Sequence, residues 1–535
     1  MKFLRDLPVL ILGLGDSGLA MARWCARCGA QVAVWDSRET PPGMAALREE
    51  LPAVPLRSGA LGAEQLAGMQ LVLKSPGLAP QDARIAPLLQ EARATGIAVL
   101  GELDLFARAL ADLKDAQAYA PKLLAITGTN GKTTSTAMTA LLVDRAGKRV
   151  AMAGNIGPTL LDTLTARLDD LPEVWVLELS SFQLEGGGTG VARGALGFEP
   201  DAAVVLNITQ DHLDWHGSLA AYTAAKSRVY GAHAVMVVNR DDPAGEALVP
   251  APVMVKGKLK LTERPVLRFG LDAPRRPGDF GLVVENGMAW LVRALPTDAS
   301  FKRRHPPPGR RVAAAVPQGE LQALGRPGDL QGDDEEEIHL QRLMPADALR
   351  VRGRHNAANA LAALALATAI GCPLAPMLHG LREYAGEPHR VQFIASIDGV
   401  EAFDDSKGTN VGATVAALVG LGADKAPGQL VVILGGDGKG QDFSPLTAPL
   451  SRHARAVATI GKDAAAIEAV VKGVPVQRFV SLEQAVPWCF AQAESGDAVL
   501  LSPACASLDM FRNYVHRAEV FVAEVQRHAA DRGQA

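Results

Sequence analysis

Residues 125–134 read AITGTNGKTT, and this stretch limits the chain to a small set of folds. It follows a short apolar run, KLLAI at 122–126, and it opens a helical pattern, TTSTAMTALLVDRAG at 133–147. A glycine-rich turn between a buried strand and a helix is the setting of a phosphate-binding loop, where backbone amides and the helix amino terminus face phosphate. The match is to the second half of the usual signature, because Ile126 stands where the first glycine is expected.

The residue types in this loop indicate ATP. The glycines let backbone amides converge, the lysine supplies a positive charge to the outer phosphates, and the threonine hydroxyl can ligate magnesium. We therefore predict an ATP site formed by Gly128, Thr129, Asn130, Gly131, Lys132, Thr133 and Thr134.

A second glycine-rich turn lies near the amino terminus. Gly13-Leu14-Gly15-Asp16-Ser17-Gly18 follows an apolar run, and the next apolar run ends at Asp36. This spacing is typical of a dinucleotide-binding unit, in which glycines approach a pyrophosphate and the acid meets a ribose. Alone it favours an NAD-dependent dehydrogenase, although any nucleotide diphosphate sugar presents the same pyrophosphate. Ser37, Arg38 and the later Ser75-Pro76-Gly77 are candidates to complete the pocket.

Composition narrows the class of protein. A length of 535 residues predicts three or four units, and a net charge of −4 gives no field that would attract nucleic acid. No apolar run approaches the roughly 18 residues of a membrane span. Five scattered cysteines fit a reducing cytoplasm, and Cys25 and Cys28 lie in a helical pattern without a second pair. We expect a cytoplasmic protein.

Short apolar runs alternate with longer helical patterns along the whole chain, which indicates βαβ units and parallel sheets. The expected strands of the first unit are PVLILGLG, QVAVWD, LVLKSPG and AVLGELDLF. Those of the second are KLLAIT, EVWVLELSS, AAVVLNIT and AVMVVN, and those of the third are VEAFDDS, QLVVILGG, AVATIG and DAVLLSPA. The predicted fold is α/β with three domains, each a mostly parallel sheet flanked by helices. We place them at 1–110 (Rossmann-like), 111–352 (ATPase-like, with the phosphate loop) and 353–535 (Rossmann-like).

A segment near 296–340 departs from this pattern. It is rich in proline and glycine, carries a basic block (Lys302, Arg303, Arg304, Arg310 and Arg311) and ends in an acidic one at 333–337. Such composition buries too little apolar surface to offset its ordering entropy. We interpret it as a flexible surface insertion, with a docking element as the alternative.

Polar residues stand where two strands of the central unit end. Glu178 ends the run VWVLE, and the next run passes into Asn207, Gln210, Asp211 and His212. Ligands of open α/β folds bind at the carboxyl edge of the sheet, so these side chains are candidates for a metal or substrate site. A hydride-transfer enzyme has no use for the ATP loop, and a simple ATPase has none for the first loop. A reaction that uses ATP to activate a nucleotide-linked substrate needs both.

At this point the chain resembles the Mur ligase family, the ATP-dependent amide-forming enzymes of peptidoglycan synthesis. The family's phosphate loop also lacks the first glycine of the usual signature. The resemblance is carried, in order, by GELDLF, AITGTNGKTT, AGNIG, LELSSFQLE, LNITQDHLD, AAKSRVY, GRHNAANALAALALA, PHR, DDSKGTNVGAT, LGGDGKGQDFSPL and LLSPACASLDMF. The DSKGTN and SPACASLD segments are most similar to the members that add D-glutamate to UDP-N-acetylmuramoyl-L-alanine, and that activity is what the resemblance implies.

The resemblance also implies roles for individual residues. The nucleotide-linked substrate would be held by Gly15, Asp16, Ser17, Gly18, Asp36, Ser37, Arg38, Ser75, Gly77, Asn155 and Gln183. ATP would also be reached from the third unit, which closes on it, by Asn359, Arg390 and Asp405. D-Glutamate would be held by Lys407, Thr409, Lys439, Ser507 and Tyr514, with tyrosine at 514 where we expect phenylalanine. The metal would be held by Thr133, Glu178, His212 and Lys226, and the residues implied in catalysis are Lys132, His212, Lys226 and Lys407.

Lys226 has a special role in similar enzymes. On sequence alone it is a solvated helix lysine, and its ammonium would be repelled by magnesium. In the family the matching lysine is carbamylated, which reverses its charge and makes it an oxygen ligand for a hard cation. The resemblance thus implies ATP, two Mg²⁺ ions and a carbamylated lysine, with a monomer acting on small molecules. The alternatives are another amide ligase of this superfamily, an NAD-dependent dehydrogenase and a non-catalytic nucleotide-binding module.

Overall fold

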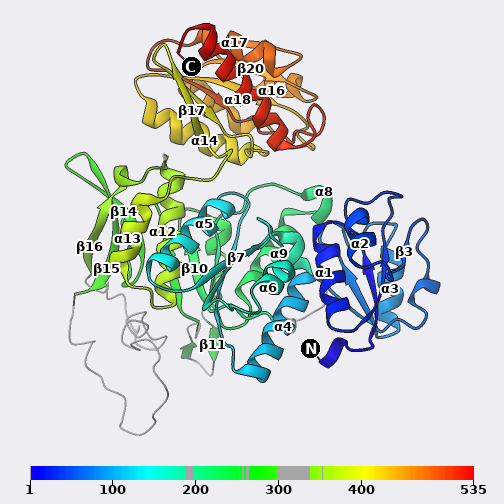
Figure 1. The fold of residues 1–535 in the computed structure, drawn as a ribbon. Coiled ribbons are helices and arrows are strands. Elements are labelled where there is room, and N and C mark those ends of the chain that lie inside the picture. Colours follow the sequence, from blue (N-terminus) through cyan, green and yellow to red (C-terminus); the bar gives the residue numbers. More distant parts are fainter. Residues whose placement is uncertain are drawn as a thin grey trace.

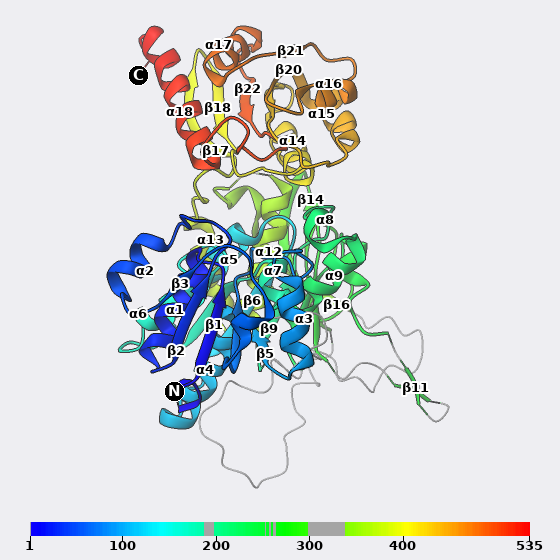
Figure 2. The same ribbon diagram turned by 90° about the vertical axis from the view of Figure 1, so that its right-hand side faces the viewer.

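The computed structural model describes residues 2–186, 197–251, 253–255, 258–260, 264–297, 338–351 and 353–534. Three α/β units follow one another along the chain, and Figure 1 shows the third standing above the central unit while the first lies beside it. A view turned by 90° gives the same arrangement (Figure 2). The predicted fold class is confirmed, because each unit is built on a mostly parallel sheet with helices packed on it.

The first unit is a five-stranded parallel sheet in the order β3-β2-β1-β4-β5. Its strands are β1 (Pro8–Leu12), β2 (Gln31–Trp35), β3 (Leu56–Arg57), β4 (Leu71–Lys74) and β5 (Ala98–Leu100). Its helices are α1 (Asp16–Arg27), α2 (Met44–Glu50), α3 (Ala86–Ala94) and α4 (Glu102–Gln117). The expected strand AVLGELDLF was wrong beyond Leu100, since Gly101 caps α4 and donates its amide to the Asp104 carboxylate at 2.7 Å.

The central unit is a six-stranded parallel sheet in the order β13-β10-β9-β6-β8-β7. Its strands are β6 (Lys122–Thr127), β7 (Val150–Gly154), β8 (Val174–Glu178), β9 (Ala202–Val205), β10 (Val235–Asn239) and β13 (Val266–Phe269). Its helices include α5 (Lys132–Arg145), α6 (Leu160–Ala166), α7 (Ser181–Glu185), α8 (Leu213–His216), α9 (Leu219–Ser227) and α10 (Pro243–Glu246). A two-stranded ribbon, β11 (Val253–Val255) and β12 (Lys258–Lys260), and an antiparallel sheet, β14 (Phe280–Glu285), β15 (Met288–Pro296) and β16 (Ile338–Pro345), are attached to it.

The third unit is a six-stranded sheet in the order β17-β18-β22-β19-β20-β21, parallel except for the β17–β18 pair. Its strands are β17 (Gln392–Ile397), β18 (Val400–Asp404), β19 (Leu430–Gly435), β20 (Ala454–Ile460), β21 (Val476–Arg478) and β22 (Ala498–Leu501). Its helices are α14 (Val411–Lys425), α15 (Thr447–His453), α16 (Ala464–Val470), α17 (Leu482–Gln492) and α18 (Tyr514–Asp531).

Packing of the helices suggests different limits for the units. Helix α4 spans the expected boundary at 110, and its Phe106 meets Trp175 of β8 edge to face at 5.2 Å, within a core shared by the first and central sheets. Helices α12 (Arg354–Ala369) and α13 (Leu374–Glu383) share the core of the other face of the central sheet with α5. We therefore propose that the third unit begins after α13, not at 353.

The predicted insertion at 296–340 lies largely outside the described residues, at 298–337. Its two ends are fixed, because β15 and β16 pair in antiparallel register with Pro296 opposite Ile338. Opposed residues of such a pair lie about 5 Å apart, so a two-residue turn is long enough to join them.

We predict that replacing residues 297–337 by Asn-Gly leaves the fold and the ligand affinities of the chain unchanged within about twofold, since all the strand pairs described for the central sheet are formed by residues outside that segment. Thermal unfolding and titration with ADP would measure this. A loss of soluble protein or of ADP binding would show that the segment stabilises the central unit.

Candidate functional site

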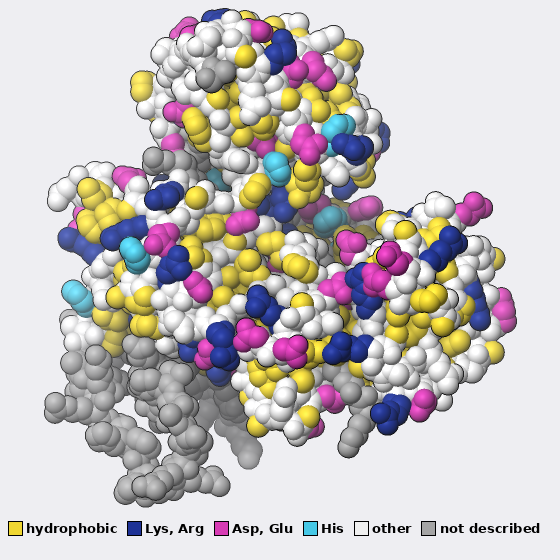
Figure 3. Space-filling model, viewed as in Figure 1, with side chains coloured by type: hydrophobic (Ala, Val, Ile, Leu, Met, Phe, Trp, Pro, Cys, Tyr) yellow, Lys and Arg dark blue, Asp and Glu magenta, His cyan; other side chains and the backbone are white. Residues whose placement is uncertain are grey.

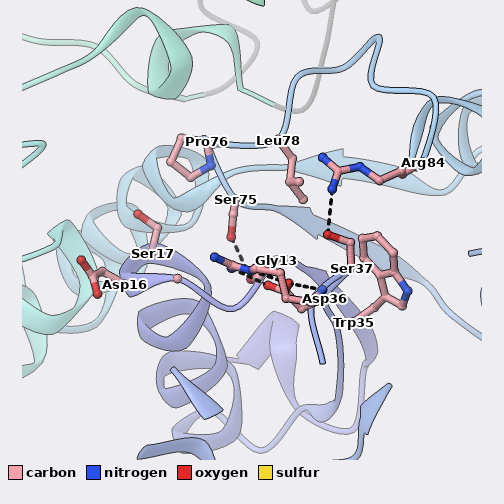
Figure 4. A pocket seen from close by; sticks show the side chains of 13 residues that line it. Gly13, Asp16, Ser17, Trp35, Asp36, Ser37, Ser75, Pro76, Leu78 and Arg84 are labelled. Atoms are coloured by element: carbon pink, nitrogen blue, oxygen red, sulfur yellow. Dashed lines mark hydrogen bonds and ion pairs between the residues drawn. The ribbon is translucent and has the colours of Figure 1, made fainter. Parts of the chain in front are cut away.

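A pocket of about 480 Å³ opens at the carboxyl edge of the first sheet, which is large enough for a nucleotide. Figure 4 shows how its walls come from three separate turns. They are formed by Gly13, Gly15, Asp16, Ser17, Trp35, Asp36, Ser37, Arg38, Ser75, Pro76, Gly77, Leu78 and Arg84. The structure thus brings together the predicted residues of this unit, except that Gly18 lies beneath the loop.

The glycine turn of this pocket requires glycine at two of its positions, Gly13 and Gly18. Gly13 has a φ of +87°, and a Cβ on Gly18 would lie 1.9 Å from the carbonyl oxygen of Gly13. The hydroxyl of Ser75 donates to the same carbonyl at 2.9 Å, so β4 holds the turn from its other side. Close backbone packing of this kind is what the third glycine of the motif permits.

Asp36 organises the second wall of the pocket. Its carboxylate accepts the amide of Leu14 at 2.7 Å and three N–H groups of Arg38 at 2.8–2.9 Å. Burial opposes ionisation, but these hydrogen bonds outweigh it and lower the pKa of Asp36 to about 2. Asp36 is therefore a fixed carboxylate that positions Arg38 as well as a candidate partner for a ribose.

Sequence reasoning missed Trp35, Leu78 and Arg84. Arg84 reaches across the pocket mouth and donates to the Ser37 hydroxyl at 2.9 Å (Figure 4). Nothing in the local pattern singles out this arginine, because it approaches from the segment before α3. Trp35 precedes Asp36 directly, and its place at the end of a buried strand was the available signal.

The predicted ATP loop joins β6 to α5. Gly128 and Gly131 have φ values of +155° and +82°, which permit its sharp turn. The end of β9 holds the loop in place, since Asn207 accepts the amide of Asn130 at 2.8 Å and donates to its carbonyl at 3.1 Å. The Lys132 ammonium donates to the carbonyls of Gly128 and Thr129 at 2.9 and 2.8 Å, and burial lowers its pKa.

A carboxylate and a histidine lie near this loop, on segments that belong to or follow β8 and β9, the strands on either side of β6. Glu178 is 2% exposed, and its Oε1 accepts the side-chain amide of Asn155 at 2.9 Å. Its Oε2 is buried without a hydrogen-bond partner among the residues that the structure describes. His212 adopts a φ of +53°, and its Nε2 lies 3.6 Å from Asp211. Burial lowers the pKa of His212, which favours the neutral imidazole that ligates metals.

Lys226 is not the solvated lysine that its sequence alone indicates. Its side chain is 1% exposed, and Nζ donates to the Gly128 carbonyl at 2.8 Å and to the Thr127 hydroxyl at 3.4 Å. Nζ also lies 4.6 Å from the centre of the Tyr222 ring. Burial, followed by the charge of Lys132, lowers the pKa of Lys226 well below its ordinary value.

The third unit meets the ATP loop through polar contacts. Arg390 and Lys407 donate to the Thr133 hydroxyl at 2.9 and 3.5 Å. Asn410, which sequence reasoning missed, donates to the Asn130 side chain at 3.0 Å and to Asp211 at 3.3 Å. Figure 3 shows a hollow between the third unit and the other two, with lysine, arginine and histidine side chains around it.

Two further residues predicted for ATP lie behind this contact. Asn359 of α12 accepts the Ser135 hydroxyl at 3.2 Å, and a Cβ on Gly131 would lie 2.6 Å from it. Asp405 accepts the Ser502 hydroxyl at 2.7 Å, and burial raises its pKa to about 7.

The residues predicted for D-glutamate fall into two groups. Lys407 lies 5.5 Å from the centre of the Tyr514 ring, and Thr409 donates its amide to the Lys407 carbonyl. Lys439 and Ser507 follow Asp437 and Ala506, which are joined by a two-way backbone bridge.

Asn155 and Gln183, predicted for the nucleotide-linked substrate, lie outside the first pocket; Asn155 follows β7 and Gln183 caps α7.

The oxygen atoms of Glu178 and Thr133 near the ATP loop suit a hard cation that is bound together with a nucleotide. Among the described residues no group of three or more His, Cys, Asp or Glu side chains is placed to hold a metal. The unpartnered oxygen of Glu178 and the hydroxyl of Thr133 are nevertheless oxygen ligands of the kind that Mg²⁺ takes when phosphates complete its shell. No helix in the described part of the chain is long and apolar enough to cross a membrane.

Three family models match the chain in order. The model for the Mur ligase MurD-like N-terminal domain matches residues 8–101, that for the Mur ligase middle domain matches 126–272, and that for the Mur ligase glutamate ligase domain matches 389–505.

Curated relatives match over their full length. A UDP-N-acetylmuramoylalanine--D-glutamate ligase of Albidiferax ferrireducens is 58% identical, with 100% of this chain and 99% of that protein covered. A protein of the same name from Burkholderia pseudomallei is 54% identical, with 98% of each chain covered.

Two solved structures share the fold. MurF ligase from Thermotoga maritima in complex with ADP has a TM-score of 0.54 at 16% identity, covering 99% of this chain and 97% of that one. UDP-N-acetylmuramate-alanine ligase MurC from the same organism has a TM-score of 0.52 at 19% identity, covering 98% of this chain and 100% of that one.

We predict that Asp36→Asn lowers the free energy of unfolding by about 2 kcal/mol, because hydrogen bonds to an ionised, buried group are lost. The pKa of Asp36 falls from its ordinary 3.8 to about 2, so its contribution is complete above pH 4 and is lost only as the pH falls towards 2. The difference from the wild type, measured by urea unfolding, should therefore stay constant between pH 5 and pH 8. Glu39→Gln, on an exposed neighbour, is the control; equal stability of the two variants would contradict the role of Asp36.

Proposed function

The chain belongs to the Mur ligase family, and from this premise we propose that it joins D-glutamate to UDP-N-acetylmuramoyl-L-alanine at the expense of ATP, in peptidoglycan precursor synthesis. The observation that carries the proposal is the full-length identity of 58% to a relative named for this reaction. The NAD-dependent dehydrogenase that the first loop alone favours does not use the second loop, whereas a ligase uses both.

The reaction must overcome the low reactivity of a carboxylate towards an amine, because direct substitution would have to expel an oxide ion, which is too basic to leave. We propose that the carboxylate of the L-alanine end attacks the γ-phosphorus of ATP, so that an acyl phosphate forms and ADP leaves. The amine of D-glutamate then attacks the acyl carbon and gives a tetrahedral intermediate. Loss of phosphate and of a proton yields the amide. The protein contributes positioning and charge stabilisation at each step.

The cationic side chains around the ATP loop are suited to the first step. Lys132 lies in the loop, and Arg390 reaches Thr133 from the third unit, so positive charge faces the phosphates from both sides. Charge on the transferred phosphoryl group spreads over its oxygens in the transition state, and fixed cations stabilise that charge. Asn359 and Asp405 support this arrangement from behind.

The nucleotide end of the substrate would occupy the first pocket. The diphosphate fits the glycine turn formed by Gly15, Asp16, Ser17 and Gly18, and the nucleoside lies against Asp36, Ser37 and Arg38. Asn155 and Gln183 stand on the central unit at strand β7 and helix α7. They would guide the sugar-peptide end towards the ATP loop.

D-Glutamate would enter from the third unit. Lys407, Lys439, Thr409 and Ser507 offer two cations and two hydroxyls, which suits an acceptor with two carboxylates. Tyr514 packs beside Lys407, and its hydroxyl leaves the ring face available to the lysine.

Thr133, Glu178, His212 and Lys226 are the residues that would hold Mg²⁺, and we propose two ions. Magnesium bound there would neutralise phosphate charge and polarise the γ-phosphoryl group. Lys226 suits carbamylation because burial favours its neutral amine, which can attack carbon dioxide. An N–C bond forms, one proton leaves, and the resulting carbamate is an anionic oxygen ligand. We further propose a cytoplasmic monomer whose partners are its small-molecule substrates.

Phosphate release tests the function directly. With UDP-N-acetylmuramoyl-L-alanine, ATP and Mg²⁺ present, adding D-glutamate should raise phosphate release at least about 100-fold over the rate with L-glutamate, because misplacing the reacting amine costs about this factor. Equal rates with both enantiomers, or release that needs no acceptor, would identify another amide ligase or a nucleotidase.

Lys226→Ala should lose most ligase activity, and short carboxylates such as formate or acetate should restore part of it by supplying the missing oxygen ligand. The exposed Lys114 of α4 provides the control, since Lys114→Ala should keep full activity and show no response to carboxylates. A Lys226→Ala variant with the ligase activity of the wild type would contradict the carbamate proposal. ADP affinity of each variant shows whether the ATP loop is still folded.

A further inference from the structure

Lys74 is a buried lysine that the chemistry above does not use. It is the last residue of β4, directly before the Ser75–Leu78 turn that lines the nucleotide pocket, and it is 1% exposed. Lysine is almost never fully buried unless its charge is partnered, because transfer of an ammonium from water is costly. The partners of Lys74 therefore show what the charge does.

The first partners are carbonyls of the pocket turn. The Lys74 ammonium donates to the Leu78 carbonyl at 2.8 Å and more weakly to that of Ser75 at 3.4 Å. These two carbonyls lie at the ends of the turn, so one cation fixes its shape. Ser75 then carries the constraint to the glycine loop through its hydrogen bond to Gly13.

The second partner belongs to the central unit. The Lys74 ammonium lies 5.7 Å from the centre of the Trp215 ring, and Trp215 is part of α8, directly after the Asp211–His212 segment. The side-chain amide of Gln81, from the segment that follows the same turn, donates to the Trp215 carbonyl. The turn is thus attached to α8 at two points.

Two carboxylates balance the charge of Lys74, one from each unit. Asp104 of α4 accepts the Gly101 amide with Oδ2, while its Oδ1 is buried with no hydrogen-bond partner among the described residues. Glu185 of α7 lies 3.4 Å from Arg228 and also faces Lys74. Burial lowers the pKa of Lys74 to about 8 although both carboxylates oppose the shift, and burial raises the pKa of Asp104 to about 6.

We propose that Lys74 is a positioning residue whose buried ammonium holds the Ser75–Leu78 turn in its binding shape and fastens that turn to α8 of the central unit. The inference rests on the proposed function, because it assumes that the pocket binds a uridine diphosphate. This role explains why β4 ends in a lysine, although an apolar residue at the same buried position would carry no desolvation cost. Only a charged group on a long stem can reach both carbonyls and the indole ring.

We expect the charge of Lys74 to strengthen the binding of UDP, so the affinity for UDP should depend on pH. Loss of the proton from Lys74 weakens its bonds to the turn, since charge-assisted hydrogen bonds are about twice as strong as neutral ones. Wild-type affinity for UDP should therefore fall as the pH rises through about 8. The terminal phosphate of UDP, with a pKa near 6, is already ionised across this range.

Calorimetric titration with UDP between pH 7 and pH 9.5 tests this on the full chain. Lys74→Met should bind UDP about tenfold more weakly at pH 7, the equivalent of one charge-assisted hydrogen bond, and should lose the fall near pH 8. Asp104→Asn keeps the lysine but removes a carboxylate that favours its charge, so the fall should move to lower pH. The control Lys114→Met, on an exposed lysine of α4, should match the wild type.

The outcomes separate the inference from the proposed function. Titration with ADP reports on the central unit and should be unchanged in all variants, which excludes general unfolding. Wild-type protein that fails to bind UDP would overturn the proposed function. Wild-type protein that binds UDP, together with a Lys74→Met variant of equal affinity or an Asp104→Asn variant with an unmoved pH profile, would overturn the role of Lys74 alone.

Discussion

Positive charge gathered at the amino end of α5 is the constraint on which the site depends. Lys132, Lys226, Arg390 and Lys407 converge on one loop. In addition to burial, the charge of Arg390 lowers the pKa of Lys132 and of Lys407, and the charge of Lys132 lowers the pKa of Lys226. Such a cluster is costly in a protein interior unless anions balance it. Glu178 supplies part of that balance, and a polyphosphate would supply the rest. The arrangement therefore favours a nucleotide triphosphate and at the same time favours a neutral Lys226.

Sheet topology explains how residues far apart in sequence reach this loop. Glu178, Asn207 and the ATP loop follow β8, β9 and β6, which are neighbours in one parallel sheet, so their carboxyl ends share an edge. Arg390 and Lys407 come from the start of the third unit, where the chain passes from α13 into β17 and from β18 into α14. Ligand binding at the carboxyl edge is the general rule for such sheets, and here two units turn that edge towards each other.

The sequence predicted the turns that follow the strands of the site, and it missed residues that reach the site from segments without a recognisable pattern. The turn between β6 and α5 could be predicted whole as a strand–loop–helix unit, because its seven residues are contiguous and a strand and a helix flank them. Arg84 and Asn410 could not, since each reaches its site from a segment with no phosphate-binding pattern. The short edge strands β3 and β21 were missed because two or three residues carry no periodicity. The alanine-rich pattern of α12 predicted a helix but not the sheet on which it packs, so no sequence pattern grouped α12 with the central unit.

The contact between the first and central units differs in physical character from the contact of the third unit with the ATP loop. This difference bears on how the substrates of the proposed reaction are brought together. The first and central units share one apolar core, in which Phe106 packs on Trp175, and Lys74 adds a buried charge at its edge. Separating them would expose apolar surface at high cost and would break the contact of the Lys74 ammonium with the Trp215 ring. The third unit meets the ATP loop through hydrogen bonds such as Arg390 to Thr133, which water can replace at little net cost. We infer that the nucleotide-linked acid and ATP are held in a fixed relation to each other, and that the amine acceptor is the substrate whose approach depends on the position of the third unit.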